Sequence, residues 1–456
     1  MNDTQPIRII DQPHKTGFRP AMDYLIDKRA IQFPDSQEFK TLTQKVKWIK
    51  HQSLMKLPEL LEQAETQLQA NGIQVHWAET TRQAQQIIHG IMLEQGADLI
   101  VKGKSMVSEE IHLNQYLQDK NIDALETDMG EFIVQLAGEA PSHIIMPAIH
   151  KSKQDIAELF QQKLGVDYTE DVDQLIHIGR TELRGAFEKA RVGLSGVNFI
   201  AADTGTLCLI ENEGNGRLST TAPDTHIAIT GIEKVIEHLS DVPTLIRSLT
   251  RSATGQPITT YVNWISSPRK PGEKDGPKAV HLVLLDNGRS ELYQKEQQQL
   301  SLACIRCGAC MNHCPVYTRI GGLAYQTTYP GPIGKVLSPH LKSLPATPDH
   351  PKASALCGAC NTVCPAGIPL TDLLLDQRNT AFGTSKVEIL VWKVWSLLNR
   401  SPKLYNSLMS VVLKLYPVLP KPMGGWTRHR KAPDLSSKTL HDRVRHYQAQ
   451  QNRSSK

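Results

Sequence analysis

The chain has 456 residues, 40% of them hydrophobic and 21% charged, which is the composition of a globular protein with several domains and buried cores. No apolar run approaches the roughly 18 residues that span a bilayer, and the start, MNDTQPIRIIDQPHKTG, has no apolar signal segment, so we expect a cytoplasmic protein. The net charge of +5 is uneven, because residues 386–456 carry 14 Lys and Arg against 3 Asp and Glu, or +11, which leaves −6 for residues 1–385.

Helices and strands are predicted to alternate from about residue 54 to residue 164. Leu57, Leu60, Leu61, Ala64 and Leu68 share one face of the first helix, and Ser152 with Asp155 resembles a capping pair at the start of the last. The predicted helices cover 54–68, 84–92, a segment opening near 108, 131–138 and 152–164, and the predicted strands cover 73–78, 97–101, 122–126 and 142–147. This alternation at short spacing indicates an α/β domain with a mostly parallel sheet.

Strands dominate the next part of the chain. Residues 197–211 read as two strands joined by a tight turn at Asp203-Thr204-Gly205, and further strands are predicted over 225–230, 258–265 and 279–285. We therefore expect an N-terminal helical extension at 1–50, the α/β domain at 51–290, a small α-helical domain at 291–385, and a basic, partly amphipathic tail at 386–456.

Seven of the eight cysteines fall in two copies of one motif. The first reads CIRCGACMNHCP at 304–315, and the second reads SALCGACNTVCP at 354–365, with Ser354 at the position of Cys304. This spacing is typical of ferredoxins that hold two [4Fe–4S] clusters, in which the last cysteine of each motif binds the other motif's cluster. Zinc is the weaker alternative, because zinc sites usually combine separated cysteine pairs. Cys208, in the apolar segment TLCLI, is expected to be a small buried residue.

The crossed pattern predicts two unequal ligand sets. The first cluster takes Cys304, Cys307, Cys310 and Cys364, and the second takes only Cys314, Cys357 and Cys360. Three alternatives follow for the second site: a [3Fe–4S] cluster, a labile [4Fe–4S] cluster with a weak fourth ligand from Ser354 or His350, or an iron open to a partner or small ligand. The labile [4Fe–4S] cluster is favoured. Two clusters held close together indicate an electron relay, although a purely structural role is the alternative.

The α/β domain offers candidates for ligand binding but no assignable catalytic residue. Open α/β sheets bind ligands beyond the carboxyl ends of their strands, and the polar residues just past predicted strand ends are Lys102, Lys104, Glu126, Asp128 and Glu131. His143 and His150 flank IIMPAI, and each is more typical of packing or surface than of catalysis. No phosphate-binding loop and no dinucleotide-binding motif is found.

The glycine-rich stretch ENEGNGRLSTT at 211–221 has two interpretations. Gly214 and Gly216 would let the backbone approach an anion, which would then be contacted by Arg217, Ser219, Thr220 and Thr221. The alternative is an ordinary hairpin loop.

The basic tail has four candidate roles. Its partner would be a nucleic acid, an anionic membrane surface or an acidic protein, and the fourth reading is a solvated helix without a partner. The apolar face with Trp392, Trp395 and Leu398 suits a protein or a membrane surface better than a nucleic acid. A peripheral position at the inner face of the membrane is thus kept beside the cytoplasmic one, and no nucleic acid is expected.

Several long segments resemble the lactate-utilisation iron–sulfur protein B family over about residues 20–430. They are VKGKSMVSEEIHLN, ETDMGEFIVQLAGEAPSHIIMPAIHK, AADTGTLCLIENEGNGRLSTTAPDTHIAITGIEK and YPGPIGKVLSP, followed by the paired cysteine motifs. The resemblance implies a lactate-utilisation (LUD) domain similar in fold to sugar-phosphate isomerases and CoA transferases (NagB/RpiA-like), then a helical two-cluster ferredoxin domain. It also implies cluster ligands at all seven motif cysteines, because the family pattern likewise has seven.

The role implied by the resemblance is electron transfer during oxidation of L-lactate to pyruvate. The companions would be a cysteine-rich iron–sulfur protein and a smaller protein with a LUD domain. Two alternatives remain: a self-contained enzyme whose α/β pocket binds a hydroxy acid or an acyl carrier, and a redox-sensing regulator that binds nucleic acid. The absence of flavin and nicotinamide motifs favours a redox subunit over a complete enzyme, because hydride removal from lactate needs a cofactor.

Overall fold

The computed structural model describes residues 15–381, 386–416, 431, 435–436 and 438–454. The chain divides into two compact units, Met1–Asn379 and Thr380–Lys456, and each is described by itself.

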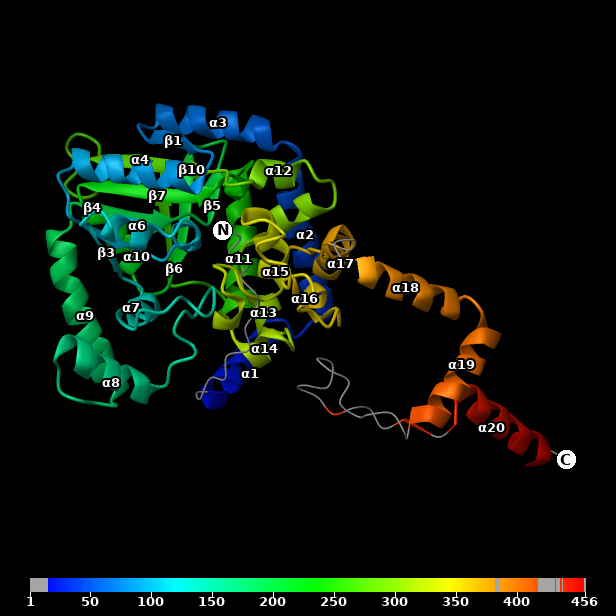
Figure 1. Cartoon of the computed structure of the whole chain (residues 1–456). Helices are drawn as coiled ribbons and strands as arrows, with labels where there is room; N and C mark the ends of the chain where they lie inside the picture. The colour runs from blue at the N-terminus through cyan, green and yellow to red at the C-terminus, as the bar shows by residue number, and fades with distance from the viewer. Residues whose placement is uncertain (1–14, 382–385, 417–430, 432–434, 437, 455–456) are drawn as a thin grey trace. The chain divides into compact units, whose positions relative to one another are not determined.

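A six-stranded parallel sheet organises the first unit, which confirms the predicted α/β class (Figure 1). Two adjacent inner strands, β10 and β7, read as nearly continuous apolar runs and are buried along almost their whole length, as expected for strands covered on both faces. The strand order is β1-β10-β7-β4-β2-β3, with β1 Gln74–Ala78, β2 Leu99–Lys102, β3 Asp123–Glu126, β4 Val192–Gly196, β7 Thr225–Gly231 and β10 Ala279–Leu285.

A second, four-stranded sheet packs beside the first. The predicted hairpin is confirmed: β5 Phe199–Ala201 and β6 Thr206–Glu211 pair antiparallel around the Asp203-Thr204-Gly205 turn. β8 Val235–Ile236 and β9 Tyr261–Ile265 complete the order β8-β5-β6-β9. Cys208 lies buried in β6, as predicted, where burial raises its thiol pKa to about 12.

Helices surround the parallel sheet. The five apolar residues predicted to share one face of α3 (Leu57–Ala70) are all buried, and α8 (Lys153–Leu164) begins with the predicted Ser152–Asp155 capping box. The other helices of this region are α4 Thr81–Glu94, α5 Met106–Glu110, α6 Leu113–Gln118, α7 Met129–Leu136, α9 Val172–Lys189, α10 Asn215–Thr221, α11 Val242–Ala253 and α12 Arg289–Tyr293.

One predicted strand is wrong, and so is one of the two interpretations of the glycine-rich stretch. Residues 142–147 form no strand, because this segment packs against the cysteine region: the Tyr317 hydroxyl donates to the Ser142 carbonyl at 2.7 Å. The glycine-rich stretch is no hairpin loop, because Gly214, with φ 83°, begins helix α10.

β4 and α9 were not predicted. β4 carries the weak strand sequence VGLSG, and its Gly193 is required because an added Cβ would lie 1.9 Å from the Ser219 carbonyl oxygen of α10.

The cysteine region is built from short helices held by two long N-terminal ones (Figure 1). α1 (Lys15–Gln32) contacts both α13 of the cysteine region and α11 of the α/β region, and α2 (Ser36–Met55) contacts α11 and β8. The short helices are α13 Ala309–Asn312, α14 Tyr317–Ile320, α15 Gly331–Leu341, α16 Ala359–Val363 and α17 Leu370–Ala381.

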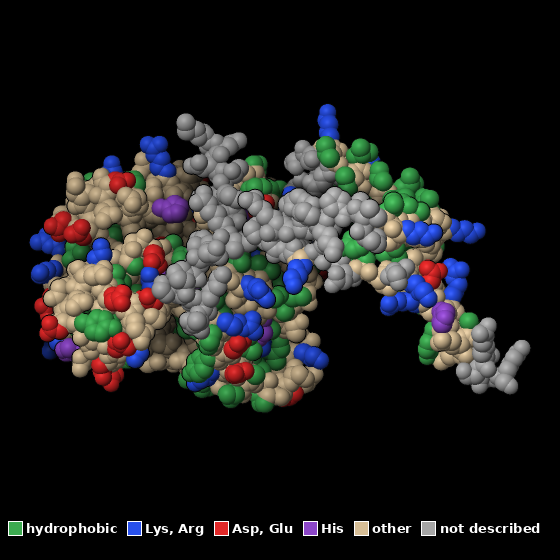
Figure 2. All heavy atoms as spheres, turned by 60° about the horizontal axis from the view of Figure 1, so that its bottom comes forward, with side chains coloured by type: hydrophobic (Ala, Val, Ile, Leu, Met, Phe, Trp, Pro, Cys, Tyr) green, Lys and Arg blue, Asp and Glu red, His purple; other side chains and the backbone are tan. Residues whose placement is uncertain are grey.

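In the part of the second unit that the structure describes, the helices are α18 Lys386–Asn399, α19 Pro402–Leu415 and α20 Leu440–Ser454. Trp392 and Trp395 of α18 are 47% and 56% exposed, and Figure 2 shows apolar side chains mixed with Lys and Arg on the surface of these helices. Among the described residues, no helix is both long and apolar enough to cross a bilayer.

Candidate functional site

The two cysteine loops repeat one backbone structure at an offset of fifty residues. Arg306 and Leu356 both have left-handed φ angles, 60° and 52°, and Gly308 and Gly358 follow with 75° and 79°. A short helix then starts in each copy, α13 after Gly308 and α16 after Gly358. The sequence repeat is therefore also a structural repeat.

The structure brings together the four cysteines of the predicted first set. Cys307, Cys310 and Cys364 are buried and Cys304 is half-buried. Burial raises the pKa of the Cys310 thiol well above its usual range, and the charges of Cys304, Cys307 and Cys364 raise it further, so all four sulfurs lie within electrostatic reach.

The three cysteines of the predicted second set also influence one another electrostatically. Burial raises the pKa of Cys360 to about 11, and the charge of Cys314 contributes next, with Cys357 also raising it. Cys314 and Cys360 are buried, whereas Cys357 is exposed. The buried Lys335 ammonium lies 3.8 Å from the Cys314 sulfur. One group is thus enclosed and the other reaches the surface.

The surroundings of these sulfurs fit iron–sulfur clusters. Backbone amides donate to three of them: Arg306 to Cys304 at 3.4 Å, Tyr317 to Cys314 at 3.5 Å and Ile368 to Cys364 at 3.4 Å. Such hydrogen bonds to sulfur are among the features by which proteins tune cluster potentials.

Excess positive charge is buried beside the first group. Lys50, Lys234 and Arg289 are buried and Arg306 is half-buried, and among the described residues they accompany the two buried carboxylates of Glu110 and Glu233. The Lys234 ammonium donates to the Cys304 carbonyl at 3.1 Å. Burial lowers the Lys234 pKa to about 8, and the nearby Arg306 lowers it as well. Because buried charge requires compensation, this excess suits a neighbouring anion, and a cluster with four thiolate ligands is anionic.

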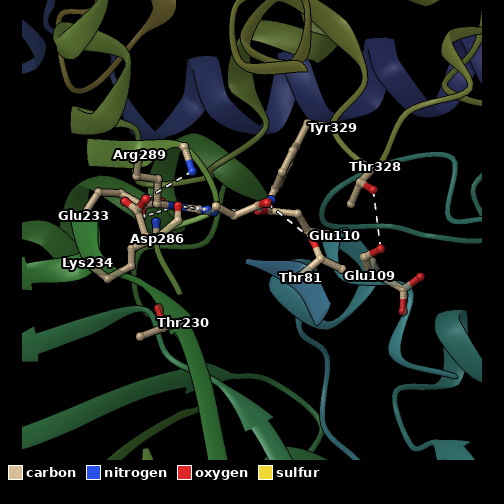
Figure 3. Close-up of polar contacts among 12 residues, drawn as sticks. Thr81, Glu109, Glu110, Thr230, Glu233, Lys234, Asp286, Arg289, Thr328 and Tyr329 are labelled. Carbon is tan, nitrogen blue, oxygen red and sulfur yellow. Dashed lines mark hydrogen bonds and ion pairs between the residues drawn. The ribbon is translucent and has the colours of Figure 1, made fainter. Parts of the chain in front are cut away.

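A chain of buried ion pairs connects this charge to the α/β region (Figure 3). Arg289 donates to Glu233 at 2.7 Å and to both oxygens of Glu110 at 2.9 and 2.7 Å. The Tyr329 hydroxyl adds a bond to Glu110 at 2.7 Å, and Arg306 contacts Glu233 at 3.3 Å while stacking over the Tyr329 ring. Although burial alone would raise it, the pKa of Glu233 falls to about 2 because Arg289, Lys234 and Arg306 surround it.

A cavity of about 370 Å³ lies between the carboxyl ends of the parallel strands and the first cysteine loop. Lys234, Arg306 and Tyr329 line it on the side of that loop, and Lys104 and Asp128 line it on the side of the sheet. Arg306 Nη1 is buried without a hydrogen-bond partner. The cavity therefore combines space for a small molecule with an unsatisfied cationic donor.

The polar residues predicted at the strand ends separate into two places. Lys104 and Asp128 line this cavity, with their charged atoms 4.0 Å apart. Lys102 is fully buried, pairs with Glu126 and lies 3.7 Å from Glu109, next to the buried Glu131. Burial and the charge of Glu126 raise the pKa of Glu131 well above its usual range. A buried lysine already compensates this acidic cluster, which lies outside the cavity lining.

The glycine-rich stretch does not offer its amides to an external anion. Glu211 accepts from the backbone amides of Gly216 and Arg217, both at 2.7 Å, so the chain's own carboxylate caps α10. The hydroxyls of Ser219, Thr220 and Thr221 bond to backbone carbonyls of the same helix.

Both candidate histidines have structural partners. His143 is buried, and its Nδ1 accepts hydrogen bonds from the Ile145 and Met146 amides. Its Nε2 lies 2.9 Å from the Asn312 side-chain oxygen, and this contact bridges the α/β and cysteine regions. Burial lowers its pKa to about 4. His150 pairs with Glu139 at 2.6 Å.

Sequence reasoning missed Glu110, Glu233, Arg289, Arg306 and Lys335. A usable signal existed for two of them, since Arg306 is the charged residue inside CIRCGAC and Lys335 the charged residue inside the apolar YPGPIGKVLSP. The partners of the other three come together only in the fold.

Family models match three consecutive parts of the chain. They are described as "LUD domain" over residues 61–285, "4Fe-4S dicluster domain" over 301–368 and "Lactate utilisation protein B, C-terminal" over 377–449.

Curated proteins match most of the chain. A protein from Shouchella clausii named "Lactate utilization protein B" is 40% identical over 87% of this chain and 86% of its own length. A protein of the same name from Bacillus velezensis is 42% identical over 78% of this chain and 76% of its own. The "Uncharacterized electron transport protein YkgF" of Escherichia coli is 42% identical over the same two shares.

Proposed function

This chain belongs to the lactate utilisation protein B family, and we propose that it is the iron–sulfur electron-transfer subunit of a complex that oxidises L-lactate to pyruvate. The family models, the names of the relatives and the paired cysteine motifs support this function. Bound clusters would supply one-electron transfer, which the side chains of this chain do not provide.

Two clusters with unequal ligand sets are proposed. Cys304, Cys307, Cys310 and Cys364 would hold the first, and Cys314, Cys357 and Cys360 would hold the second. The grouping of the sulfurs into four and three and the amides that donate to them support this assignment.

The single observation that carries the electron-transfer role is the contrast between the two groups. In the four-cysteine group three sulfurs are buried and Cys304 is half-buried, whereas Cys357 of the other group is exposed. An enclosed site is shielded from solvent oxidants, and an exposed one can approach a redox partner. We therefore propose that the first cluster is the inner end of the relay and the second cluster the outer end.

The proposed partners are a cysteine-rich iron–sulfur protein and a smaller LUD-domain protein. The basic second unit, with the exposed Trp392 and Trp395, offers an amphipathic surface for one of them or for an anionic membrane at its inner face.

Anaerobic reconstitution tests this function. The chain would be purified with and without each companion protein, L-lactate added, and reduction followed by the bleaching of visible absorbance and by EPR. We expect lactate-dependent reduction only when the companions are present. Reduction of the isolated chain by lactate, or none in the full complex, would contradict the proposed role.

A second candidate function is binding of a small carboxylate in the cavity, as in a self-contained hydroxy-acid enzyme. The unpartnered Arg306 Nη1 beside Lys234 and Tyr329 favours it specifically. Calorimetric titration of the anaerobic protein with L-lactate and pyruvate, compared with Arg306→Gln, would decide. Binding lost in the variant supports this function, and no binding by the unaltered protein excludes it.

A further inference from the structure

We propose that the hydroxyl of Ser354 is the fourth protein ligand of the second cluster, completing a [4Fe–4S] site with one oxygen and three sulfur ligands. The inference rests on the proposed function, because it assumes that Cys314, Cys357 and Cys360 bind a cluster.

The side chain of Ser354 occupies the same local position as that of Cys304. The Arg306 amide donates to the Cys304 sulfur at 3.4 Å, and the Leu356 amide, fifty residues later, donates to the Ser354 hydroxyl oxygen at 3.2 Å. In both copies the donating residue has a left-handed φ, 60° and 52°, and comes directly before the second ligand position of the motif.

The backbone that follows is also the same. The amide of Met311 donates to the Gly308 carbonyl at 2.9 Å, and that of Asn361 donates to the Gly358 carbonyl at 2.9 Å. The last cysteine of each motif repeats the pattern: the Cys314 amide donates to Met311 at 3.1 Å and the Cys364 amide to Asn361 at 3.3 Å. The two loops differ at the amide of the first position, which donates to Ser301 three residues back in one copy and to Lys352 two residues back in the other. Because the hydrogen bonds from that side chain onward recur, we place the Ser354 oxygen at the position that corresponds to the Cys304 sulfur.

The position of Ser354 is fixed from outside the loop as well. The Arg378 guanidinium of α17 donates to the Ser354 carbonyl at 2.8 Å and to the Pro351 carbonyl at 2.7 Å. The side chain is therefore presented by an anchored backbone, which lowers the entropic cost of using a weak oxygen ligand.

His350, the other candidate ligand, has no such correspondence. The repeat aligns it with Leu300, which is not a predicted ligand. It is fully buried, its Nε2 lies 3.4 Å from the Thr327 hydroxyl, and its ring packs 6.1 Å from that of Tyr325. These contacts engage Nε2 and the ring, whereas Nδ1 is buried without a hydrogen-bond partner among the described residues. The choice of Ser354 over His350 therefore rests on the correspondence between the two motifs.

Coordination by Ser354 forms an iron–oxygen bond and breaks the hydroxyl O–H bond, with the proton passing to solvent, which reaches this half-buried residue. No electron is transferred in this step. The buried Lys335, 3.8 Å from the Cys314 sulfur, supplies positive charge that favours the resulting anionic oxygen in the same site.

The test compares anaerobically prepared protein with Ser354→Ala, Ser354→Cys and, as a control in the same motif, Thr362→Ala, whose side chain is exposed on α16. Iron and sulfide content, EPR after oxidation and Mössbauer spectra would be measured on each. We expect two [4Fe–4S] clusters in the unaltered protein and in Thr362→Ala, with one iron subsite showing the Mössbauer parameters of oxygen coordination. Ser354→Ala should lose about one iron per chain and show the EPR signal of an oxidised [3Fe–4S] cluster, whereas Ser354→Cys should keep its iron and lose the oxygen-type subsite.

Three results would overturn the inference: a [3Fe–4S] cluster already present in the unaltered protein, no spectroscopic change in Ser354→Ala, or an unchanged iron subsite in Ser354→Cys. If Ser354→Ala fails to assemble its clusters, the Mössbauer spectrum of Ser354→Cys still tests whether the oxygen-type iron subsite depends on residue 354. A different result, iron for only one cluster in the unaltered protein, would instead count against the proposed pair of clusters.

Discussion

Replacing Arg289 by Met should destabilise the first unit far more than removing an exposed arginine. Arg289 is fully buried and makes three hydrogen bonds of 2.7–2.9 Å to the carboxylates of Glu110 and Glu233, so its loss leaves two buried negative charges only partly compensated. Breaking a buried ion pair by removing one partner costs about 3–5 kcal/mol. The 379 residues of this unit imply an unfolding entropy of about 0.8 kcal/mol/K, so the apparent Tm should fall by about 4–6 °C.

The control is Arg247→Met, the same substitution at an ion pair with Glu38 in which Arg247 is 59% exposed. An exposed pair contributes about 0–1 kcal/mol, so the Tm should move by about 1 °C or less. Both variants would be followed by circular dichroism under anaerobic conditions at one scan rate, because an apparent Tm depends on scan rate whenever unfolding is irreversible.

A second substitution identifies the cause. If uncompensated carboxylates cause the loss, Glu110→Gln should restore part of the Tm in the Arg289→Met background. Equal Tm shifts in Arg289→Met and Arg247→Met, or a further fall on adding Glu110→Gln, would refute the reasoning.

Three further predictions concern the cysteine region and the buried histidines. Cys304→Ala should lose about half of the iron and abolish lactate-dependent reduction in the complex, whereas Cys208→Ala, outside the motifs, should keep its iron. Iron analysis and EPR measure both effects. Retained reduction in Cys304→Ala would count against the relay. Gly358→Ala should lower the free energy of unfolding by about 1–2 kcal/mol, because Gly358 has a left-handed φ. Gly308→Ala should lower it by more, because the added Cβ would also lie 3.2 Å from the His143 ring. An equal Tm for both variants would contradict the predicted contact with His143. Stability should fall as the pH drops below about 6.5, because burial lowers the pKa of His143 to about 4 and that of His226 to about 3. Below pH 6.5 the unfolded chain therefore binds protons at these histidines that the folded chain does not bind. A Tm unchanged between pH 7.5 and 5.5 would contradict this.

The parallel sheet was predictable wherever burial on both faces left a plain apolar run. AVHLVLL and THIAIT form β10 and β7 as predicted. VGLSG was missed because glycine lowers strand propensity, and its Gly193 is required by the close approach of α10. Residues 142–147 show the opposite error. Their apolar sequence favours a strand, but contacts of Ser142 and His143 with the cysteine region override it.

The candidate site was predictable to the extent that it is local in sequence. Motif spacing alone predicts the two cysteine groups that the structure brings together, and their role as ligands stays a prediction. The buried cations were not predictable, since Lys50 and Arg289 lie 239 residues apart and acquire their roles only through Glu233. The glycine-rich stretch misled for a related reason, because its amides are used by Glu211, an acidic residue inside the same segment.

The proposed membership of Cys364 in the first ligand set has a consequence for how the protein matures. Its three companions come from the first motif, so this group is complete only after the chain has doubled back over the intervening segment. Once that closure has occurred, three of the four sulfurs are shut away from solvent. The first cluster should therefore be inserted before or during this closure. A chain that folds without the first cluster should be unable to take it up later. The second site, with Cys357 at the surface, should still be able to take up a cluster in the folded protein.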